Sequence, residues 1–147
     1  MPPVADIPDL PDINFWLAVV DENHVHHQAA KRYWREAAST QLFFCRVSML
    51  GFLRLSTQPR VLSRPLATRE AWQTYRRFLA LPEIRFRREP ENLETIFALI
   101  SQRSDLPHSL WTDAYLAAFA IADGCRLVSF DADFHRFPDL SFLHLVA

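Results

Sequence analysis

Two nearly continuous apolar runs constrain the fold of this chain more than any other feature: "LFFCRV" at residues 42–47 and "CRLVSF" at residues 125–130. Each run has the length of a strand and offers no polar face, which is typical of a parallel strand that is buried on both sides. Three further stretches, at residues 7–12, 83–87 and 141–146, have the length and composition of strands. The sequence therefore predicts a sheet of five strands, most of them parallel.

Segments with apolar residues at helical spacing alternate with these strands. The expected helices cover residues 14–20, 24–38, 48–58, about 68–79, 93–100 and 111–123. Ser48 and Thr68 are expected to cap the third and fourth helices, and Gly124 to end the last one. This alternation predicts an α/β fold, a three-layer α/β/α sandwich around a mostly parallel sheet. Because the chain has 147 residues and no repeat or linker, we expect one domain over residues 1–147.

The small number of glycines and cysteines excludes several classes of protein. With only Gly51 and Gly124, the chain cannot form a GxGxxG dinucleotide fingerprint or a GxxxxGK[ST] P-loop. Cys45 and Cys125 occur singly, which favours a reducing cytoplasm over a disulfide framework or a structural zinc site. No apolar run reaches the roughly 18 residues of a bilayer span, and no basic segment marks a signal peptide. We therefore expect a cytoplasmic protein that does not contact a membrane.

Three aspartates are expected at one edge of the predicted sheet. Asp12 follows the first strand, Asp131 follows the fourth, and Asp113 lies in the first turn of the helix that leads into the fourth. That helix runs antiparallel to its strand, so its first turn returns to the carboxyl ends of the strands, where such sheets bind ligands. Neighbouring carboxylates repel one another, and Mg²⁺ or Mn²⁺ removes the conflict. Such a site suits phosphodiester hydrolysis by an activated water.

Each aspartate taken alone also has a purely structural interpretation. Asp113 favours the helix dipole from a first turn, and Asp131 suits a turn. Asp12 with Asn14 can form an Asx turn that caps a helix. These interpretations stay open for each residue, but they do not explain why all three aspartates converge on one edge.

Several segments resemble a known family in order and spacing. "LPDIN" (10–14), "TDAYLAA" (112–118) and "LVSFDADF" (127–134) resemble the first, third and fourth acidic motifs of PIN-domain ribonucleases, and more narrowly of the VapC-type toxins of bacterial toxin–antitoxin pairs. "HVHHQAAKRYW" (24–34) and "GFLRLSTQPRV" (51–61) resemble one branch of these toxins. The resemblance extends over nearly the whole chain.

The resemblance implies a PIN-like α/β/α fold and a Mg²⁺- or Mn²⁺-dependent endonuclease that acts on RNA. It also implies neutralisation by a cognate antitoxin, and members of the family commonly form homodimers. Carried over by position, Asp12, Asp113 and Asp131 are the carboxylates of the metal site. Thr112 matches the small hydroxyl residue that often precedes the third acid, and Asn14 matches the polar residue after the first.

The chain departs from the family pattern at Gly51. The family usually has a glutamate there, in an E-x-x-R pattern, whereas this chain keeps only the arginine, Arg54. Reduced activity, weaker metal binding and replacement of the glutamate by Asp133 are the open alternatives. Arg54 is a candidate for binding phosphate or ordering a carboxylate; as a surface arginine it would instead pair with an antitoxin or a helix carboxylate.

Histidines and arginines supply further candidates. In "HVHH" (24–27), adjacent helical positions diverge by about 100°, which favours helix initiation and packing over a metal site. All of the 16 basic residues except Lys31 are arginines, whose planar fork suits phosphate recognition; a GC-rich genome that favours arginine codons is the alternative explanation. The arginines of "RFRR" (85–88) are candidates for contact with an RNA backbone.

Two functions of different classes follow. The first is a metal-dependent endoribonuclease, the toxin of a toxin–antitoxin pair. The second, motivated by the missing glutamate, is a catalytically weak PIN-like domain that acts by binding RNA or a protein. A small-molecule phosphatase ranks last, because Lys31 is poorly placed to assist a nucleophilic aspartate.

Overall fold

The core of the fold is a five-stranded parallel sheet, seen in a computed structural model that describes residues 6–103 and 105–146. The strands are β1 (Asp9–Pro11), β2 (Leu42–Phe44), β3 (Ile84–Phe86), β4 (Arg126–Ser129) and β5 (Phe142–His144). Their order is β3-β2-β1-β4-β5, and each described pair is parallel. The predicted sheet is confirmed, although each strand is shorter than the segment that was predicted to form it.

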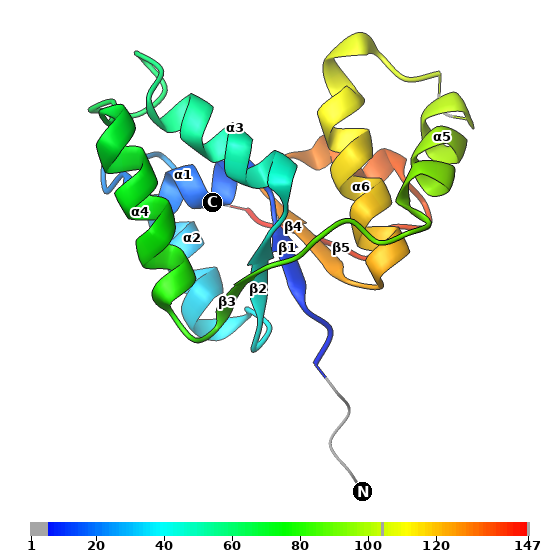
Figure 1. Cartoon of the computed structure of the whole chain (residues 1–147), viewed down its shortest axis with the longest axis horizontal. Helices are drawn as coiled ribbons and strands as arrows, with labels where there is room; N and C mark the ends of the chain where they lie inside the picture. The colour runs from blue at the N-terminus through cyan, green and yellow to red at the C-terminus, as the bar shows by residue number, and fades with distance from the viewer. Residues whose placement is uncertain (1–5, 104, 147) are drawn as a thin grey trace, which may run out of the picture.

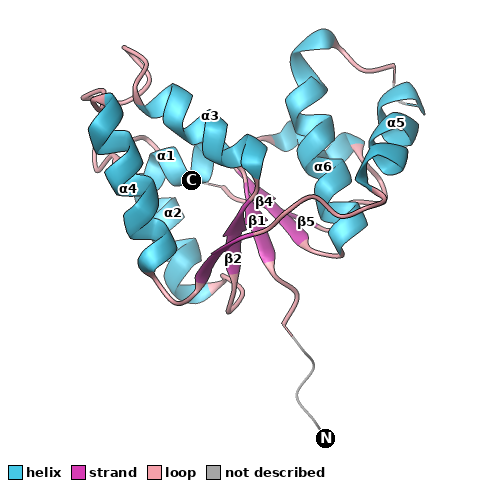
Figure 2. Ribbon diagram, viewed as in Figure 1, coloured by secondary structure: helices cyan, strands magenta, loops and turns pink. Residues whose placement is uncertain are grey.

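Helices cover both faces of the sheet. They are α1 (Ile13–Val20), α2 (His27–Glu36), α3 (Arg46–Ser56), α4 (Thr68–Ala80), α5 (Leu93–Arg103) and α6 (Trp111–Asp123), with short 3₁₀ helices η1 (His108–Leu110) and η2 (Ala132–Arg136). Helices α1 to α4 lie on one face, and α5 and α6 lie on the other (Figures 1 and 2). The predicted α/β/α sandwich is therefore confirmed. Within the described ranges, no helix combines the length and apolar character that crossing a bilayer requires.

The apolar runs are continuous because each central strand contributes to two cores. Successive strand residues point to opposite faces. Phe44 stacks on Trp16 of α1 with ring centroids 4.1 Å apart. Its neighbour Phe43 packs on Phe119 of α6, with centroids 5.7 Å apart. All four of these aromatic side chains are fully buried.

Two of the three expected caps are wrong by position. Helix α3 begins at Arg46 with Cys45 as its N-cap, and the Ser48 hydroxyl accepts a hydrogen bond from the Cys45 N–H at 3.0 Å from inside the first turn. Thr68 is the first residue of α4 and not its cap; the Glu70 carboxylate accepts from the preceding N–H of Ala67 at 3.1 Å. Gly124, with φ of 70°, ends α6 in the left-handed conformation as predicted.

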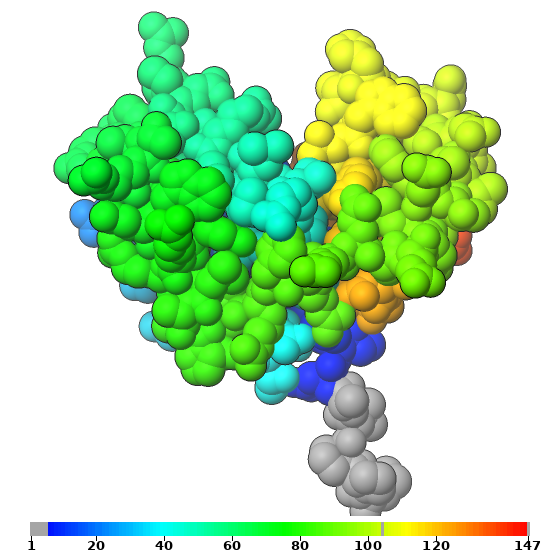
Figure 3. All heavy atoms as spheres, viewed as in Figure 1, coloured from blue at the N-terminus to red at the C-terminus, as the bar shows by residue number. Residues whose placement is uncertain are grey.

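The two edges of the sheet differ in their surface. Helix α3 begins at the carboxyl end of β2, and Figure 3 shows the surface hollowed between α3 and α6. At the opposite, amino edge, Asp9 is fully buried and accepts two hydrogen bonds from Arg126, at 2.8 and 2.9 Å. It also accepts from the Tyr33 hydroxyl at 2.6 Å.

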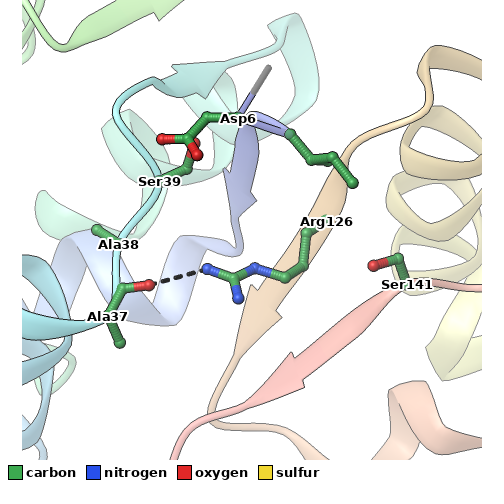
Figure 4. A pocket seen from close by; sticks show the side chains of 7 residues that line it. Asp6, Ala37, Ala38, Ser39, Arg126 and Ser141 are labelled. Atoms are coloured by element: carbon green, nitrogen blue, oxygen red, sulfur yellow. Dashed lines mark hydrogen bonds between the residues drawn. The ribbon is translucent and has the colours of Figure 1, made fainter. Parts of the chain in front are cut away.

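Arg126 also faces a cavity of about 390 Å³ at this amino edge, beside Asp6, Ser39 and Ser141 (Figure 4). Its guanidinium reaches across to donate to the Ala37 carbonyl at 3.0 Å, so α2, β1 and β4 are joined by one charged group. Three hydrogen bonds from Nε and Nη2 of this guanidinium are made within the protein, which gives Arg126 a structural role.

Candidate functional site

The strand order reverses between β1 and β4, and α/β sheets bind ligands at the carboxyl ends of such strands. Asp12 follows β1 directly, and its N–H donates to the Val128 carbonyl of β4 at 2.8 Å. Asp131 lies in the turn that follows β4, and Asp113 lies in the first turn of α6. The structure therefore places all three predicted aspartates at this edge of the sheet.

Asp12 is held rigidly and is almost fully buried, with 7% of its surface exposed. Its Oδ1 accepts from the Ile13 N–H at 2.7 Å and caps α1, while its Oδ2 accepts from the Ser129 hydroxyl at 2.8 Å. It thus caps the helix through Ile13 and not through an Asx turn with Asn14. A carboxylate has about four acceptor sites, so these bonds leave it free to bind a further group. Burial raises the pKa of Asp12, and the nearby charge of Asp131 adds to the effect.

Ser129, which the sequence reasoning missed, organises this edge. It is fully buried at the end of β4. Besides donating to Asp12, its hydroxyl accepts from Asn14 Nδ2 at 3.0 Å and from the Asp131 N–H at 2.9 Å. The only signal in the sequence was a polar residue at the end of a strand that is apolar apart from its first residue, Arg126. Asn14, predicted as a supporting residue, therefore acts on Asp12 and Asp131 through Ser129.

Asp113, Asp131 and Asp133 form the compact part of the cluster, with one carboxylate oxygen of each within 4.8 Å of the others. Asp131 also accepts from the Asp133 N–H at 2.9 Å, which fixes the start of η2. Burial raises the pKa of Asp113 to about 7, and the charges of Asp12, Asp131 and Asp133 contribute. Asp12 lies outside the compact group but close enough for its charge to act on Asp113.

These four carboxylates have the chemistry of a site for a hard divalent cation. Oxygen ligands, several of them anionic, are what Mg²⁺ and Mn²⁺ prefer. Among the described residues no lysine or arginine forms an ion pair with any of the four. In the described part of the chain, Asp113, Asp131 and Asp133 are also the only group of three or more His, Cys, Asp or Glu side chains close enough to share a metal ion. A cation would relieve the repulsion that raises the pKa of Asp113.

Gly51, at the position of the missing acid, packs against the first residue of α1. A Cβ atom on Gly51 would overlap the Cδ1 atom of Ile13 and lie 2.9 Å from its Cγ1 atom. The space that a side chain would need is therefore filled by Ile13, next to Asp12 in the sequence. A glutamate at position 51 would require the Ile13 side chain to move.

The other predicted residues lie at the periphery. Thr112 and Arg54 are exposed, on α6 and α3, and within the described residues neither forms a side-chain hydrogen bond or an ion pair with the aspartates. The histidines have local roles: His24 Nδ1 accepts from the His26 N–H at 3.0 Å, and the His26 ring stacks on Phe130 with centroids 4.3 Å apart. His27 Nδ1 lies 2.7 Å from the Ala18 carbonyl. These contacts agree with helix initiation and packing.

Comparisons of the sequence with known proteins give a consistent result. The family model of the PIN domain matches residues 10–140. Ribonuclease VapC41 of Mycobacterium tuberculosis is 38% identical over 143 residues, which covers 92% of this chain and 97% of the relative. Ribonuclease VapC33 of the same organism is 32% identical over 136 residues, covering 90% and 94%.

Solved structures show the same fold at lower sequence identity. The sarcin–ricin-loop-cleaving toxin VapC20 of Mycobacterium tuberculosis superposes with a TM-score of 0.66 at 19% identity, covering 86% of this chain and 92% of its own. The VapBC2 complex of Rickettsia felis, bound to promoter DNA, contains a chain with a TM-score of 0.68 at 11% identity, covering 95% and 100%. The sequence matches and the shared fold together show that the chain belongs to the PIN-domain family and, within it, to the VapC ribonucleases.

Proposed function

We propose that this chain is a Mg²⁺- or Mn²⁺-dependent endoribonuclease and the toxin of a VapBC-type toxin–antitoxin pair. One observation carries the proposal: four aspartates, none of which forms an ion pair with a described basic residue, lie at the strand-order reversal of a PIN-type sheet, where the charge of Arg136 only partly offsets their effect on Asp113. The names of the relatives, ribonucleases VapC41 and VapC33, support the same class of reaction. We assign the metal site to Asp12, Asp113 and Asp131, with Asp133 in place of the missing glutamate.

The protein's own groups prepare the site for this reaction. The Ser129 hydroxyl binds one oxygen of Asp12, and the N–H of Ile13, the first residue of α1, binds the other. These two hydrogen bonds fix the orientation of the carboxylate. Asp113, whose pKa is raised to about 7, would be one of the residues that hold the cation, and binding of the cation there would release a proton close to neutral pH. A bound Mg²⁺ or Mn²⁺ supplies Lewis acidity, which lowers the pKa of water and polarises a phosphoryl oxygen.

The proposed reaction is hydrolysis of an RNA phosphodiester. The oxygen of a water molecule forms a bond to phosphorus as the bond from phosphorus to the 3′-oxygen breaks. The proton of the water ends on the 3′-oxygen, directly or through solvent. The products are a 5′-phosphate and a 3′-hydroxyl end.

A cleavage assay tests the proposal. The purified chain is incubated with structured RNA in the presence of Mg²⁺ or Mn²⁺, and separately in EDTA. The variants Asp12→Asn and Asp113→Asn are assayed in the same way with metal. We expect cleavage with metal and its loss in EDTA and in both variants. Asp139→Asn is the matched control, because this exposed carboxylate lies outside the cluster and pairs with Arg103 at 3.6 Å. Activity that survives EDTA or both substitutions would contradict the mechanism.

A second candidate function rests on Gly51. Because Ile13 fills the place of the usual acidic side chain, the site has one carboxylate fewer on the side of α3. A PIN-like domain with weak catalysis would act by binding RNA or a partner protein. RNA binding that persists while neither metal supports cleavage would favour this alternative over the first.

We further propose a cognate antitoxin and a homodimer as protein partners, in the cytoplasm. Large apolar side chains are more than half exposed on three helices: Leu50 on α3 is 59% exposed, Leu99 on α5 55% and Trp111 on α6 52%. Exposed apolar side chains that gather in a patch mark protein interfaces. Cys45 and Cys125 are free and buried, which suits a reducing compartment. Light scattering of the purified chain, and co-purification with the product of the neighbouring reading frame, test these partners.

A further inference from the structure

A second polar feature lies on the carboxyl edge of the sheet, at the ends of β2 and β3. A hollow of about 530 Å³ is lined there by Arg46, Phe86, Arg87, Arg88 and Glu89. Arg46 is the first residue of α3, directly after the end of β2, and the other four residues lie at and beyond the end of β3. The hollow therefore occupies the same edge as the aspartate cluster, on the other side of β2.

Arg46, which the sequence reasoning did not single out, is held in place by its neighbours. Its guanidinium carbon lies 4.4 Å from the centroid of the Phe86 ring, and one of its N–H groups points at the Met49 sulfur at 3.3 Å. Phe86 is in turn fixed in β3 by its register with Phe44. A guanidinium backed by a ring keeps its remaining N–H groups for a ligand and loses little conformational entropy on binding.

The charges in the hollow separate the arginines into two kinds. Arg87 forms an ion pair with Asp123 and donates to the Gln41 side chain at 3.1 Å, so its charge is used within the protein. Arg46 and Arg88 are exposed, and neither forms an ion pair within the described ranges. Glu89 accepts a hydrogen bond from the Tyr115 hydroxyl at 2.6 Å. The hollow thus offers two guanidinium groups without an ion pair beside an aromatic ring, together with the carboxylate of Glu89.

The position of the hollow relates it to the cluster of aspartates. Strand β2 lies between β1 and β3, and β4 lies beyond β1. Because neighbouring strands are about 4.8 Å apart, the end of β3 is on the order of 10 Å from the end of β1, which Asp12 follows, and about 14 Å from the end of β4, which Asp131 follows. A single strand of RNA that enters the aspartate site can therefore reach Arg46 and Arg88 with its next one or two nucleotides.

We infer that Arg46, Phe86 and Arg88 form a subsite for the single-stranded RNA that flanks the scissile phosphate, an inference that rests on the proposed nuclease function. Arg46 and Arg88 contact a backbone phosphate, and the ring-backed guanidinium of Arg46 offers a plane on which a base stacks. The shared edge with the aspartates favours RNA over an acidic protein segment as the occupant.

The inference is tested by direct binding, without turnover. A fluorescein-labelled, unstructured RNA of about 12 nucleotides containing all four bases is titrated in EDTA with the wild type and with Arg46→Ala, Arg88→Ala and the double variant. We expect each single substitution to weaken binding by roughly three- to tenfold, and the slope of log K against log salt to fall by about 0.7 per arginine removed. Arg46→Lys keeps the positive charge but loses the planar guanidinium. Compared with Arg46→Ala, it should therefore recover the wild-type dependence of binding on salt but only part of the wild-type affinity.

Arg76→Ala is the matched control, because Arg76 also lies over a ring, that of Trp72 at 5.3 Å, but on α4. The inference is overturned if the wild type does not bind the RNA, or if Arg46→Ala and Arg88→Ala bind it like Arg76→Ala. It is also overturned if polyglutamate, and not RNA, binds with dependence on Arg46 and Arg88. Cleavage by the wild type separates the two proposals. If the wild type cleaves RNA but Arg46→Ala and Arg88→Ala bind RNA as tightly as the wild type, only the subsite is rejected. If the wild type cleaves no RNA, the nuclease function is rejected.

Discussion

Asp9 and Asp12 lie on the same short stretch of chain, one at each end of β1, and both are buried. Asp9 faces a cation, since Arg126 and Tyr33 donate to its oxygens. Asp12 has only neutral donors, Ser129 and the N–H of Ile13, and its charge interacts with the carboxylates of Asp113 and Asp131. A buried carboxylate with a built-in cation joins parts of the fold, whereas one surrounded by like charges needs a cation from outside.

The largest effect should separate these two aspartates by activity. Asp12→Asn is expected to lower RNA cleavage by on the order of a thousandfold, because it removes an anionic ligand from a reaction that depends on several kcal/mol of charge stabilisation. Asp9→Asn should leave the cleavage rate of the folded fraction nearly unchanged. Rates normalised to the folded fraction from circular dichroism measure the contrast. Equal losses in the two variants would break the comparison.

Stability should separate the two aspartates in the opposite direction. Arg126→Met leaves Asp9 as an uncompensated buried charge, and breaking such a pair costs about 3 kcal/mol where, as here, the arginine is partly exposed. Asp12→Asn should instead leave the free energy of unfolding unchanged or raise it, because it removes a charge from a repulsive cluster. Urea unfolding in EDTA measures both. The comparison fails if Asp12→Asn destabilises the chain as much as Arg126→Met.

Ser129→Ala sharpens the role of the hydroxyl that holds Asp12. It removes the hydrogen bond at 2.8 Å to Asp12 and leaves the Asn14 amide without its acceptor. Loss of a group that orients a ligand typically costs about 10- to 100-fold in metal affinity or activity. Titration with Mn²⁺ should therefore show weaker binding, and raising the Mn²⁺ concentration should recover part of the cleavage. Unchanged metal affinity would show that Ser129 supports only the fold.

The pKa of Asp113 predicts how metal and pH act together. Its pKa is raised from 3.8 to about 7, so the folded state holds the proton more tightly than the unfolded state in this window. In the metal-free protein, the contribution of Asp113 to the free energy of unfolding is therefore fully present below about pH 4 and is lost as the pH rises to about 7. Mn²⁺ replaces the proton, so the increase in Tm caused by metal should be a few degrees at pH 8 and smaller at pH 6. Asp113→Asn should remove this pH dependence of the metal effect; if it persists in that variant, another group is responsible.

The smallest effect concerns the contact between Gly51 and Ile13. Gly51→Ala should destabilise the chain by about 1 kcal/mol, because overpacking costs about 1–3 kcal/mol and alanine regains about 0.5–1 kcal/mol in a helix. In an Ile13→Val background, which removes the overlapping Cδ1 atom, the same substitution should cost less. Urea unfolding of the wild type, the two single variants and the double variant gives the coupling energy between the two positions. Additive effects would show that the two positions do not share this space.

Much of the fold was predictable because its signals are local. The buried strands, the amphipathic helices and the left-handed Gly124 follow from periodicity and from the conformational freedom of glycine, and the structure agrees with each. The caps at Ser48 and Thr68 were wrong, because the residues before them, Cys45 and Ala67, have the extended backbone that begins each helix.

The position of the aspartates was predictable for a different reason. In a sheet of parallel strands linked by helices, all carboxyl ends meet at one edge, so Asp12, Asp113 and Asp131 had to approach one another. Asp133 joins them because its N–H donates to the Asp131 carboxylate at the start of η2. Hydrophobic periodicity in the sequence does not predict this short helix.

By itself, the sequence determined the layered sheet and the edge at which the carboxylates gather, because both depend on patterns within short segments. Only the tertiary structure decided which aspartate is neutralised, what fills the space beside Gly51 and which arginines stay free. Asp9 meets Arg126 from the far end of the chain, Gly51 meets Ile13, and Arg46 meets Phe86. Ion pairing and steric contact depend on distances between such remote residues, and those distances exist only once the helices have packed on the sheet.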